Sequence, residues 1–354
     1  MTSSSSSSPS SSPFLAACRG EPHAYTPVWF MRQAGRSLPE YRAIRGDGSI
    51  LDAIAQPDLA AEISLQPVRR YGVDAAILYS DIVVPAAAIG FGVDVAPGTG
   101  PVVTEPFASA TDLDRLRPLE PEADTPYVLE TVRTLTAELP PDVPVIGFAG
   151  APFTVASYLV EGRPSRTYAK TKALMLGEPA LFAALLDRLA HLAADSIASQ
   201  VAAGARAFQL FDSWAGALTP AQYEHHVLPH SRTVFERLAG LDVPGIHFGV
   251  NTGELLALMG SAGADVVGVD WRTPLSAARE RVGAGRALQG NLDPAVCLGP
   301  WDAVEAEVRA VLDESGGHSA YVFNLGHGVL PETDPSVLER VVELVHREGK
   351  VIEP

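Results

Sequence analysis

Residues 245–269 read GIHFGVNTGELLALMGSAGADVVGV, and the pattern of this stretch is the clearest indication of the fold class. Two short apolar runs, 245–248 and 266–269, flank a helix-like stretch rich in Leu and Ala. Runs this brief, bounded by Gly, Pro or Asp, are typical of strands buried on both faces of a parallel sheet. A strand, a helix and a second parallel strand form the unit from which α/β proteins are built.

The same unit recurs along most of the chain. Apolar runs of this kind are found at residues 28–30, 75–78, 143–147, 207–210, 245–248, 266–269, 287–290 and 321–324. Helical patterns lie between them, the clearest at 178–200 and 331–347. Eight β–α alternations predict a single-domain (β/α)8 barrel with extra helices and loop insertions. A doubly wound sheet is the alternative, although no run leads into a GxGxxG turn.

The chain also contains segments that a minimal barrel would not need. Residues 85–121 are rich in Pro and Gly and fit a loop insertion after the second strand. Residues 1–12 are dominated by serine and lack the basic start and apolar core of a signal peptide. We therefore expect a disordered tail over 1–12 and the barrel domain over 13–354.

Composition limits the partners and the compartment. The 26 basic and 42 acidic side chains give a net charge of −16, which argues against nucleic acid or an anionic membrane as partner. Cys18 and Cys297 are the two cysteines, and their wide separation fits a reducing cytosol rather than a disulfide framework or a zinc site. No apolar run is long enough to span a bilayer. The expected location is the cytoplasm.

A local cluster of arginines stands out in this acidic chain. The segment Arg32-Gln33-Ala34-Gly35-Arg36 is followed by Arg42 and Arg45. In a helix or turn, the spacing of Arg32 and Arg36 puts both guanidinium groups on one side, and arginine binds carboxylates through paired hydrogen bonds. The cluster predicts a binding site for a polyanionic small molecule. The alternative is a solvated face that makes ordinary surface ion pairs.

Polar residues follow nearly every candidate strand. Active sites of (β/α)8 barrels lie at the carboxyl ends of the strands, so these residues are the candidates for chemistry. They are Arg32, Asp81, Ser213, His247, Asp270, Asn291 and His327. An arginine pair, a carboxylate and a Gly-His-Gly sequence in these places favour an enzyme.

Asp81 and His327 are the most informative of these residues. Asp81 stands in the apolar run 79–83, where a carboxylate needs hydrogen-bond donors or takes up a proton. It would accept hydrogen bonds from a ligand, or alternatively cap a helix or form a structural salt bridge. The glycines on either side of His327 would let its imidazole approach a ligand closely, although a lone histidine is more often structural.

Two further side chains are weaker candidates. Tyr158 follows the segment 150–154 and would hydrogen-bond into the cavity, or it is a core tyrosine with a satisfied hydroxyl. Ser213 has neither a GxSxG setting nor an adjacent base, so it is a hydrogen-bond donor rather than a nucleophile.

Taken in order, these motifs resemble those of the uroporphyrinogen decarboxylase family. The resemblance covers almost the whole chain after the serine tail, and it includes residues 32–36, 79–82, 150–154 with Tyr158, 209–213, 289–294 and 324–328. It implies a homodimeric single-domain barrel. It also implies conversion of uroporphyrinogen III to coproporphyrinogen III, with loss of four acetate carboxyl groups and without a metal or cofactor.

The resemblance also implies roles by position. The implied carboxylate clamp consists of Arg32, Gln33, Ala34, Gly35 and Arg36. Asp81 would face the pyrrole N–H groups, and the further substrate contacts would be Arg45, Tyr158, Ser213 and His327.

The chemistry agrees with these roles, because protonation of a pyrrole α-carbon supplies an electron sink and an ionised Asp81 would stabilise the resulting cation. Arg32 is a poor acid, so a bound water or a substrate carboxyl group are alternatives as proton donor.

Two other functions compete with this interpretation. Corrinoid-dependent methyltransferases on a related barrel use a His-x-Cys pair and a distant cysteine to hold zinc. The comparable segment here is His247-Phe248-Gly249, and Cys297 alone would not complete such a site. A catalytically silent tetrapyrrole carrier is the second competitor. It would bind the porphyrinogen without releasing carbon dioxide.

Overall fold

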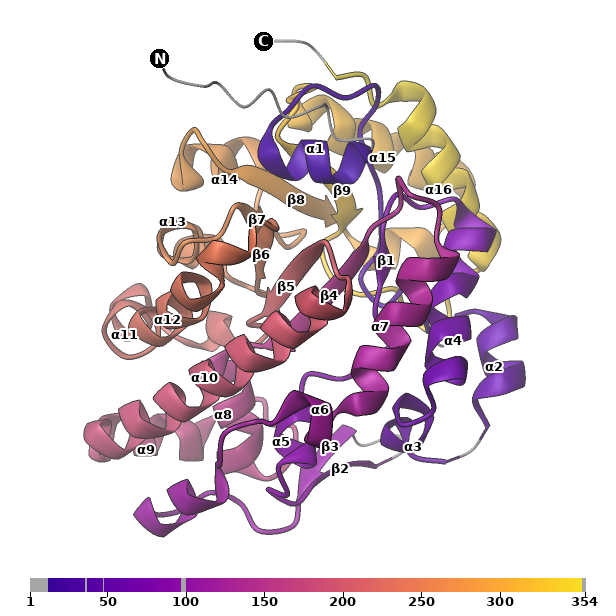
Figure 1. Cartoon of the computed structure of the whole chain (residues 1–354). Helices are drawn as coiled ribbons and strands as arrows, with labels where there is room; N and C mark the ends of the chain where they lie inside the picture. The colour runs from indigo at the N-terminus through magenta and orange to yellow at the C-terminus, as the bar shows by residue number, and fades with distance from the viewer. Residues whose placement is uncertain (1–11, 36, 47, 97–99, 352–354) are drawn as a thin grey trace, which may run out of the picture.

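A computed structural model describes residues 12–35, 37–46, 48–96 and 100–351. Its main sheet has seven parallel strands that neighbour one another in chain order (Figure 1). They are β1 Ala76–Ile77, β4 Val145–Gly150, β5 Ala207–Phe211, β6 Gly245–Phe248, β7 Val266–Gly268, β8 Ala287–Leu292 and β9 Tyr321–Leu325. A doubly wound sheet would reverse its strand order at a switch point, so this order excludes that alternative.

Residues 28–30, the first predicted strand, lie between the two edges of this sheet. Val28 forms a parallel bridge with Phe323 of β9, and the carbonyl of Val28 accepts a hydrogen bond of 2.8 Å from the amide of Asp74, just before β1. The segment therefore closes the ring at the eighth position. The segment forms only an isolated bridge because side chains, rather than a neighbouring strand, accept hydrogen bonds from some of its amides. Gln33 Oε1 accepts from the amide of Phe30 at 3.0 Å.

Helices alternate with the strands and cover the outside of the ring (Figure 1). Many of them begin with proline at the first helical position, where its missing N–H costs nothing. The α-helices are α1 Pro13–Arg19, α2 Pro39–Arg45, α3 Ile50–Ile54, α4 Pro57–Tyr71, α5 Val84–Ala88, α6 Pro121–Asp124, α7 Pro126–Glu138, α8 Pro152–Glu161, α9 Ala169–Gly177, α10 Pro179–Ala203, α11 Pro220–His226, α12 Leu228–Leu238, α13 Leu256–Ser261, α14 Leu275–Val282, α15 Trp301–Ser315 and α16 Pro335–Glu348. Short 3₁₀ helices span Ala110–Arg115, Ala215–Ala217, Ala239–Leu241, Gly253–Leu255 and Pro294–Leu298.

The two helices predicted most clearly are both present. The pattern at 178–200 corresponds to α10, and the pattern at 331–347 corresponds to α16, which begins four residues later than predicted. The delay has a local cause: Asp334 Oδ1 accepts a hydrogen bond of 2.9 Å from the amide of Ser336 and so caps the helix at Pro335.

Two of the polar residues predicted at strand ends lie within strands instead. His247 belongs to β6 and turns toward the outer helices, where its Nδ1 lies 3.3 Å from the carbonyl oxygen of Met259. Asn291 belongs to β8, which continues to Leu292. Its amide donates to the carbonyl oxygens of Asp270 and Thr273 and so holds the turn after β7. The prediction that His247 and Asn291 follow their strands is therefore wrong.

The two ends of the barrel are covered differently. Helix α1 packs beside the amino ends of β8 and β9, and the insertion predicted over 85–121 lies at the opposite end (Figure 1). The insertion forms α5, an antiparallel hairpin of β2 Val93–Ala96 and β3 Gly100–Val103, and a 3₁₀ helix. Ser12, assigned to the tail by composition, is buried and its Oγ accepts a hydrogen bond from the amide of Leu15. Residues 1–11 lie outside the described residues.

A buried polar chain crosses the interior of the barrel. Trp29 Nε1 donates to Gln289 Oε1 at 2.9 Å, and Gln289 Nε2 donates to Gln209 Oε1 at 2.9 Å. All three side chains are inaccessible to solvent or nearly so. Buried polar groups need such partners, and the chain links the closing segment to β8 and then to β5 across the interior.

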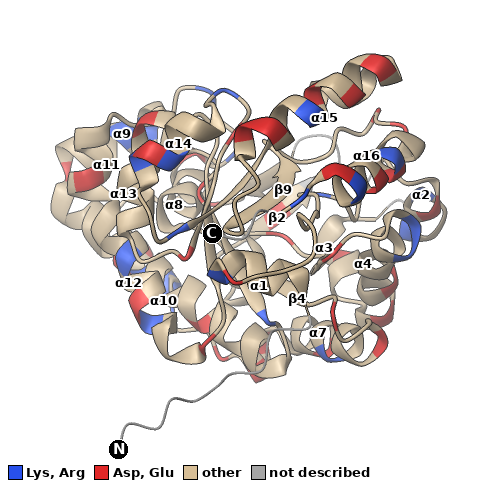
Figure 2. Ribbon diagram, turned by 90° about the horizontal axis from the view of Figure 1, so that it is seen from above, with Lys and Arg blue, Asp and Glu red and all other residues tan. Residues whose placement is uncertain are grey.

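The described residues include both cysteines, for which the sequence predicted no disulfide framework. Cys18 and Cys297 are both free and buried, and burial raises the pKa of each thiol. Within the described parts of the chain, none of the helices combines the length and the hydropathy of a membrane span. In the view of Figure 2, basic and acidic residues are interspersed over the outer helices and the basic ones do not gather on one face.

Candidate functional site

The loop that carries Arg32 is fixed to the carboxyl end of β9. The amide of Met31 donates to Asn324 Oδ1 at 3.2 Å, and the carbonyl of Met31 accepts from the amide of Val329 at 2.9 Å. Arg32 itself has a positive φ of 60°, a conformation that non-glycine residues adopt rarely. The surrounding bonds therefore hold Arg32 in a strained turn beside the end of β9.

The residues that follow Arg32 hold this turn in place through a buried side chain and a close backbone approach. Gln33 is fully buried, and its Nε2 donates to the carbonyl of Ala75 at 3.0 Å, which fastens the loop to the chain before β1. A Cβ on Gly35 would lie 3.0 Å from the carbonyl oxygen of Arg32. Ala34 and Gly35 are partly buried. Arg36 lies outside the described residues.

The positive charge of Arg32 acts on three other residues predicted from the sequence. The carbon stem of Arg32 lies over Gly328, where a Cβ would be only 2.5 Å from Cδ. Burial is the largest influence on the pKa of Asp81, Tyr158 and His327, and the positive charge of Arg32 acts on all three. Arg32, Asp81 and His327 follow the carboxyl ends of strands, and Tyr158 lies on α8, the helix after β4, so all four belong to the carboxyl end of the barrel.

Asp81 follows β1 and is partly buried. Its Oδ1 accepts a hydrogen bond of 3.0 Å from the amide of Val83. Burial raises its pKa above the usual range, while the amides of Val83 and Ile82 and the charge of Arg32 act in the opposite direction. Further hydrogen-bond donors from a ligand would favour the ionised carboxylate.

Tyr158, on α8, lies near Asp81 and packs against an aromatic residue from another loop. Its ring centroid is 3.9 Å from that of Trp214, which follows Ser213 after β5. Thr154 holds this loop, because its Oγ1 donates to Asp212 at 2.9 Å and accepts from the amide of Trp214 at 3.2 Å. Burial, followed by the charge of Asp81, raises the pKa of Tyr158, so its phenol stays protonated at neutral pH.

His327 lies on the turn after β9 and is mostly buried. Its Nδ1 accepts a hydrogen bond of 2.6 Å from the amide of Gly328. Burial, together with the charge of Arg32, lowers its pKa to about 4. His327 is therefore neutral at physiological pH and has Nε2 available for a hydrogen bond to a ligand.

Arg45 belongs to a neighbouring cluster rather than to the group around Arg32. Burial acts to lower its pKa, and hydrogen bonds with the phenols of Tyr79 and Tyr41 raise it overall. The two phenol oxygens are 3.1 Å apart. Because Tyr79 is two residues from Asp81, this cluster lies beside the central one, on the side where α2 ends.

Acidification is expected to destabilise the fold through His327. Unfolded His327 binds a proton near pH 6.5, whereas the folded protein binds it only near pH 4, so stability falls as the pH is lowered through this window. The loss is at most about 3 kcal/mol. Urea unfolding at pH 7 and pH 4.5 should show a larger decrease for the wild type than for His327→Gln. Equal decreases in the two proteins would contradict the assignment.

Several residues around this cluster were not singled out as site residues by the sequence. Phe248 of β6 has its ring 6.3 Å from that of His327, and Trp214 stacks on Tyr158. Arg272 lies after β7, and its charge is one of the influences on the pKa of His327, after burial and Arg32. Their position along the chain is the one feature of the sequence that could have indicated them, because Arg272 and Trp214 each follow the end of a predicted strand by a few residues.

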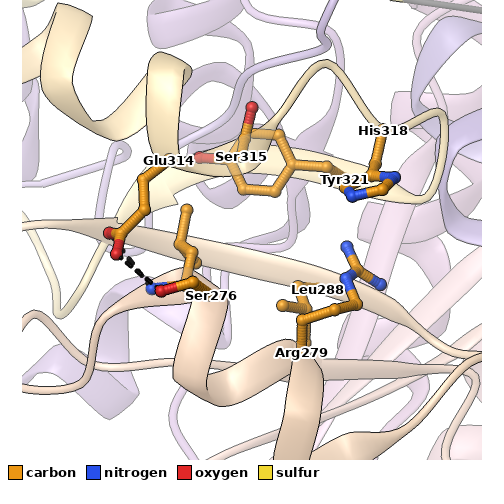
Figure 3. A pocket seen from close by; sticks show the side chains of 8 residues that line it. Ser276, Arg279, Leu288, Glu314, Ser315, His318 and Tyr321 are labelled. Carbon is orange, nitrogen blue, oxygen red and sulfur yellow. Dashed lines mark hydrogen bonds between the residues drawn. The ribbon is translucent and has the colours of Figure 1, made fainter.

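A cavity lies at the opposite end of the barrel from this cluster. It has a volume of about 240 Å³, lies between α14 and α15 beside the amino ends of β8 and β9, and contains Arg279 and Glu314 (Figure 3). Active sites of barrels lie at the other end of the strands, so this cavity is not the candidate site. Among the described residues, no three His, Cys, Asp or Glu side chains converge in a way that would hold a metal ion.

Comparisons with known proteins cover nearly the whole chain. The family model described as uroporphyrinogen decarboxylase (URO-D) matches residues 9–348. A uroporphyrinogen decarboxylase of Salinispora tropica is 61% identical over 338 residues, covering 96% of this chain and 91% of the relative. One from Streptomyces coelicolor is 62% identical over 335 residues, covering 95% of this chain and 94% of the relative.

Solved structures share the fold at much lower identity. A methyltransferase from Methanosarcina mazei superposes with a TM-score of 0.78 at 21% identity, covering 95% of this chain and 97% of that one. A B12-independent methionine synthase from a Shewanella species gives 0.56 at 13% identity, covering 92% and 96% of the two chains. These likenesses show the barrel fold, whereas the family match and the close relatives cover nearly the whole sequence. The chain belongs to the uroporphyrinogen decarboxylase family.

Proposed function

We propose that this protein removes the carboxyl groups of the four acetate side chains of uroporphyrinogen III and releases coproporphyrinogen III and carbon dioxide. The observation that carries the proposal is the grouping of Asp81 with Arg32, Tyr158 and His327 at the carboxyl end of the barrel, in a chain of this family. A carboxylate beside an arginine suits a ligand that has both N–H donors and carboxylates.

The cationic side chains would bind the substrate's carboxylates. Arg32 lies on the turn held to the end of β9, Arg45 lies beside Tyr79 at the end of α2, and the segment Gln33-Ala34-Gly35 separates Arg32 from Arg36 in the sequence. Arginine forms paired hydrogen bonds with carboxylates, and a protein with a net charge of −16 would otherwise repel a polyanion. Ser213, the phenol of Tyr158 and neutral His327 would add uncharged hydrogen bonds.

Asp81 would act on the ring rather than on the carboxylates. Its oxygen atoms would accept hydrogen bonds from the pyrrole N–H groups, which keeps the carboxylate ionised in spite of burial. Protonation of a pyrrole α-carbon creates a cationic ring, and the negative charge of the partly buried Asp81 would stabilise that cation.

The substrate then supplies its own electron sink. The bond between the acetate methylene and its carboxyl carbon breaks, carbon dioxide leaves, and the electron pair neutralises the ring. Protonation of the methylene carbon and loss of the α-carbon proton restore the pyrrole with a methyl group. We infer that no metal or organic cofactor takes part, and that the protein acts as a homodimer in the cytoplasm.

Turnover without added cofactor tests the proposal directly. Metal-stripped protein is incubated anaerobically with uroporphyrinogen III, and the oxidised products are separated by chromatography, with heat-inactivated protein as the control. We expect stepwise appearance of products with seven, six, five and four carboxyl groups. Tight binding of the porphyrinogen without any product would instead identify a tetrapyrrole carrier.

A further inference from the structure

The substrate of the proposed reaction has more carboxylates than the clamp segment has cations. Uroporphyrinogen carries eight carboxylates and its product keeps four, whereas the arginines implied as contacts by the family are Arg32, Arg36 and Arg45. Unpaired carboxylates would project toward other loops at the carboxyl end of the barrel. The loop after β7 offers a cation that no family motif assigns.

Arg272 is held firmly although about half of its side chain is exposed. Its Nη1 donates to Asp270 Oδ2 at 3.0 Å, with 47% of the Arg272 side chain and 1% of the Asp270 side chain accessible to solvent. Its guanidinium carbon lies 3.8 Å from the ring centroid of Trp271. An arginine anchored on two sides loses little freedom when it binds a ligand, which favours recognition.

The negative charge of Asp270 is shared with backbone donors. Its oxygens also accept hydrogen bonds from the amides of Arg272, at 2.9 Å, and of Asn251. Because two amides also stabilise this carboxylate, the ion pair of Asp270 with Arg272 leaves part of the positive charge of the guanidinium group uncompensated. The remaining guanidinium donors are available to a second anion.

The loop that carries Arg272 packs directly against the turn that carries His327. A Cβ on Gly326 would lie 2.3 Å from the backbone nitrogen of Trp271, so the two turns are in backbone contact. Arg272 also lines a cavity of about 400 Å³ together with Gly216, Asn251 and Arg281, from the loops after β5 and β6 and from α14. The cavity therefore adjoins the turn of His327 through the loop that carries Arg272.

We propose that Arg272 binds one peripheral carboxylate of the tetrapyrrole in this cavity, and this rests on the proposed function. Arg281 is the second cation of the cavity, but it belongs to α14 and not to the loop that packs against the turn of His327. It pairs with Glu254 at 3.3 Å and donates to the carbonyl of Gly253 at 2.7 Å. The carboxylate belongs to a propionate, which the product keeps, or to an acetate, which the product has lost. Substrate and product therefore distinguish the two sources.

The test compares Arg272→Gln, Arg272→Lys and a matched control, Arg340→Gln. The glutamine amide can still bond to Asp270, and lysine keeps the charge. Arg340 lies 3.7 Å from the ring centroid of Trp301, so the control also removes a cation from a tryptophan face, but on the outer helices α15 and α16. Thermal unfolding of each variant checks that the fold is retained.

Arg272→Gln should raise KM for uroporphyrinogen III about tenfold and leave kcat within about twofold, as expected for loss of one charged hydrogen bond. Arg272→Lys should recover most of this loss, and Arg340→Gln should behave as wild type. An equal rise in the inhibition constant of coproporphyrinogen III assigns the contact to a propionate, and an unchanged constant assigns it to an acetate.

Two outcomes would overturn the inference. An unchanged KM in Arg272→Gln means that no carboxylate binds there, and a fall in kcat at constant KM means that Arg272 only holds Asp270 and the turn. If the wild-type protein showed no turnover, the proposed function would be contradicted but the inference on Arg272 would not. The ratio of the affinities of Arg272→Gln and wild type for uroporphyrinogen III would still test whether Arg272 binds a carboxylate.

Discussion

Asp81→Asn is expected to lower kcat by a factor of about 10² to 10³ while the protein stays folded, a loss typical of removing one preorganised electrostatic contact in an active site. The asparagine side chain has nearly the same shape, and its oxygen can still accept the 3.0 Å hydrogen bond from the amide of Val83. What disappears is the negative charge that stabilises the protonated pyrrole. Steady-state kinetics with uroporphyrinogen III, alongside denaturant unfolding, measures both quantities.

Asp94→Asn is the matched control for this experiment. Asp94 is an exposed carboxylate on the β2–β3 hairpin, and its Oδ1 also accepts a hydrogen bond from a backbone amide, that of Val95 at 2.7 Å. The same change there should leave kcat near the wild-type value. If Asp81→Asn also retained near-normal kcat, Asp81 would have no part in the reaction.

Gly326→Ala is expected to damage both the fold and the site. The added Cβ would lie 2.3 Å from the backbone nitrogen of Trp271 and 3.0 Å from the carbonyl carbon of Asp270. These are backbone atoms, so the clash cannot be relieved by a side-chain rotation and the two turns must separate. Overpacking of this kind costs about 1–3 kcal/mol of unfolding free energy. Displacement of His327 should reduce kcat/KM by more than tenfold.

Gly177→Ala provides the comparison for the glycine substitution. Gly177 ends α9, and a Cβ there would meet no atom within 4 Å. Alanine is favoured over glycine in a helix, so stability should be unchanged or slightly higher and activity unaffected. Wild-type stability and activity in Gly326→Ala would show that the turns after β7 and β9 are free to move apart without consequence.

The alternation of apolar runs was sufficient to predict the barrel because buried parallel strands carry their signal locally. Seven of the eight predicted runs overlap paired strands, in the order that a barrel requires. The eighth, 28–30, closes the ring through a single bridge at Val28. Its reduced pairing depends on side chains such as Gln33 and Asn324, whose partners no local pattern reveals.

Side-chain direction was the less predictable part of the site. His247 and Phe248 are neighbours on β6, and strand geometry turns them to opposite sides, so His247 lies against the outer helices while Phe248 approaches His327. A strand boundary that differs by two residues, as at Asn291, also changes whether a residue lies in the sheet or on the loop beyond it.

Strand order, acidic character and the candidate residues could all be predicted from the chain alone, because strand periodicity, net charge and short motifs are local properties. The folded structure was needed to show that the charge of Arg32 acts on Asp81, Tyr158 and His327, and that the loop of Arg272 packs against the turn of His327. Those residues are separated by tens to hundreds of positions in the chain. They become neighbours only when the parallel strands close into a ring and bring their carboxyl ends to one face.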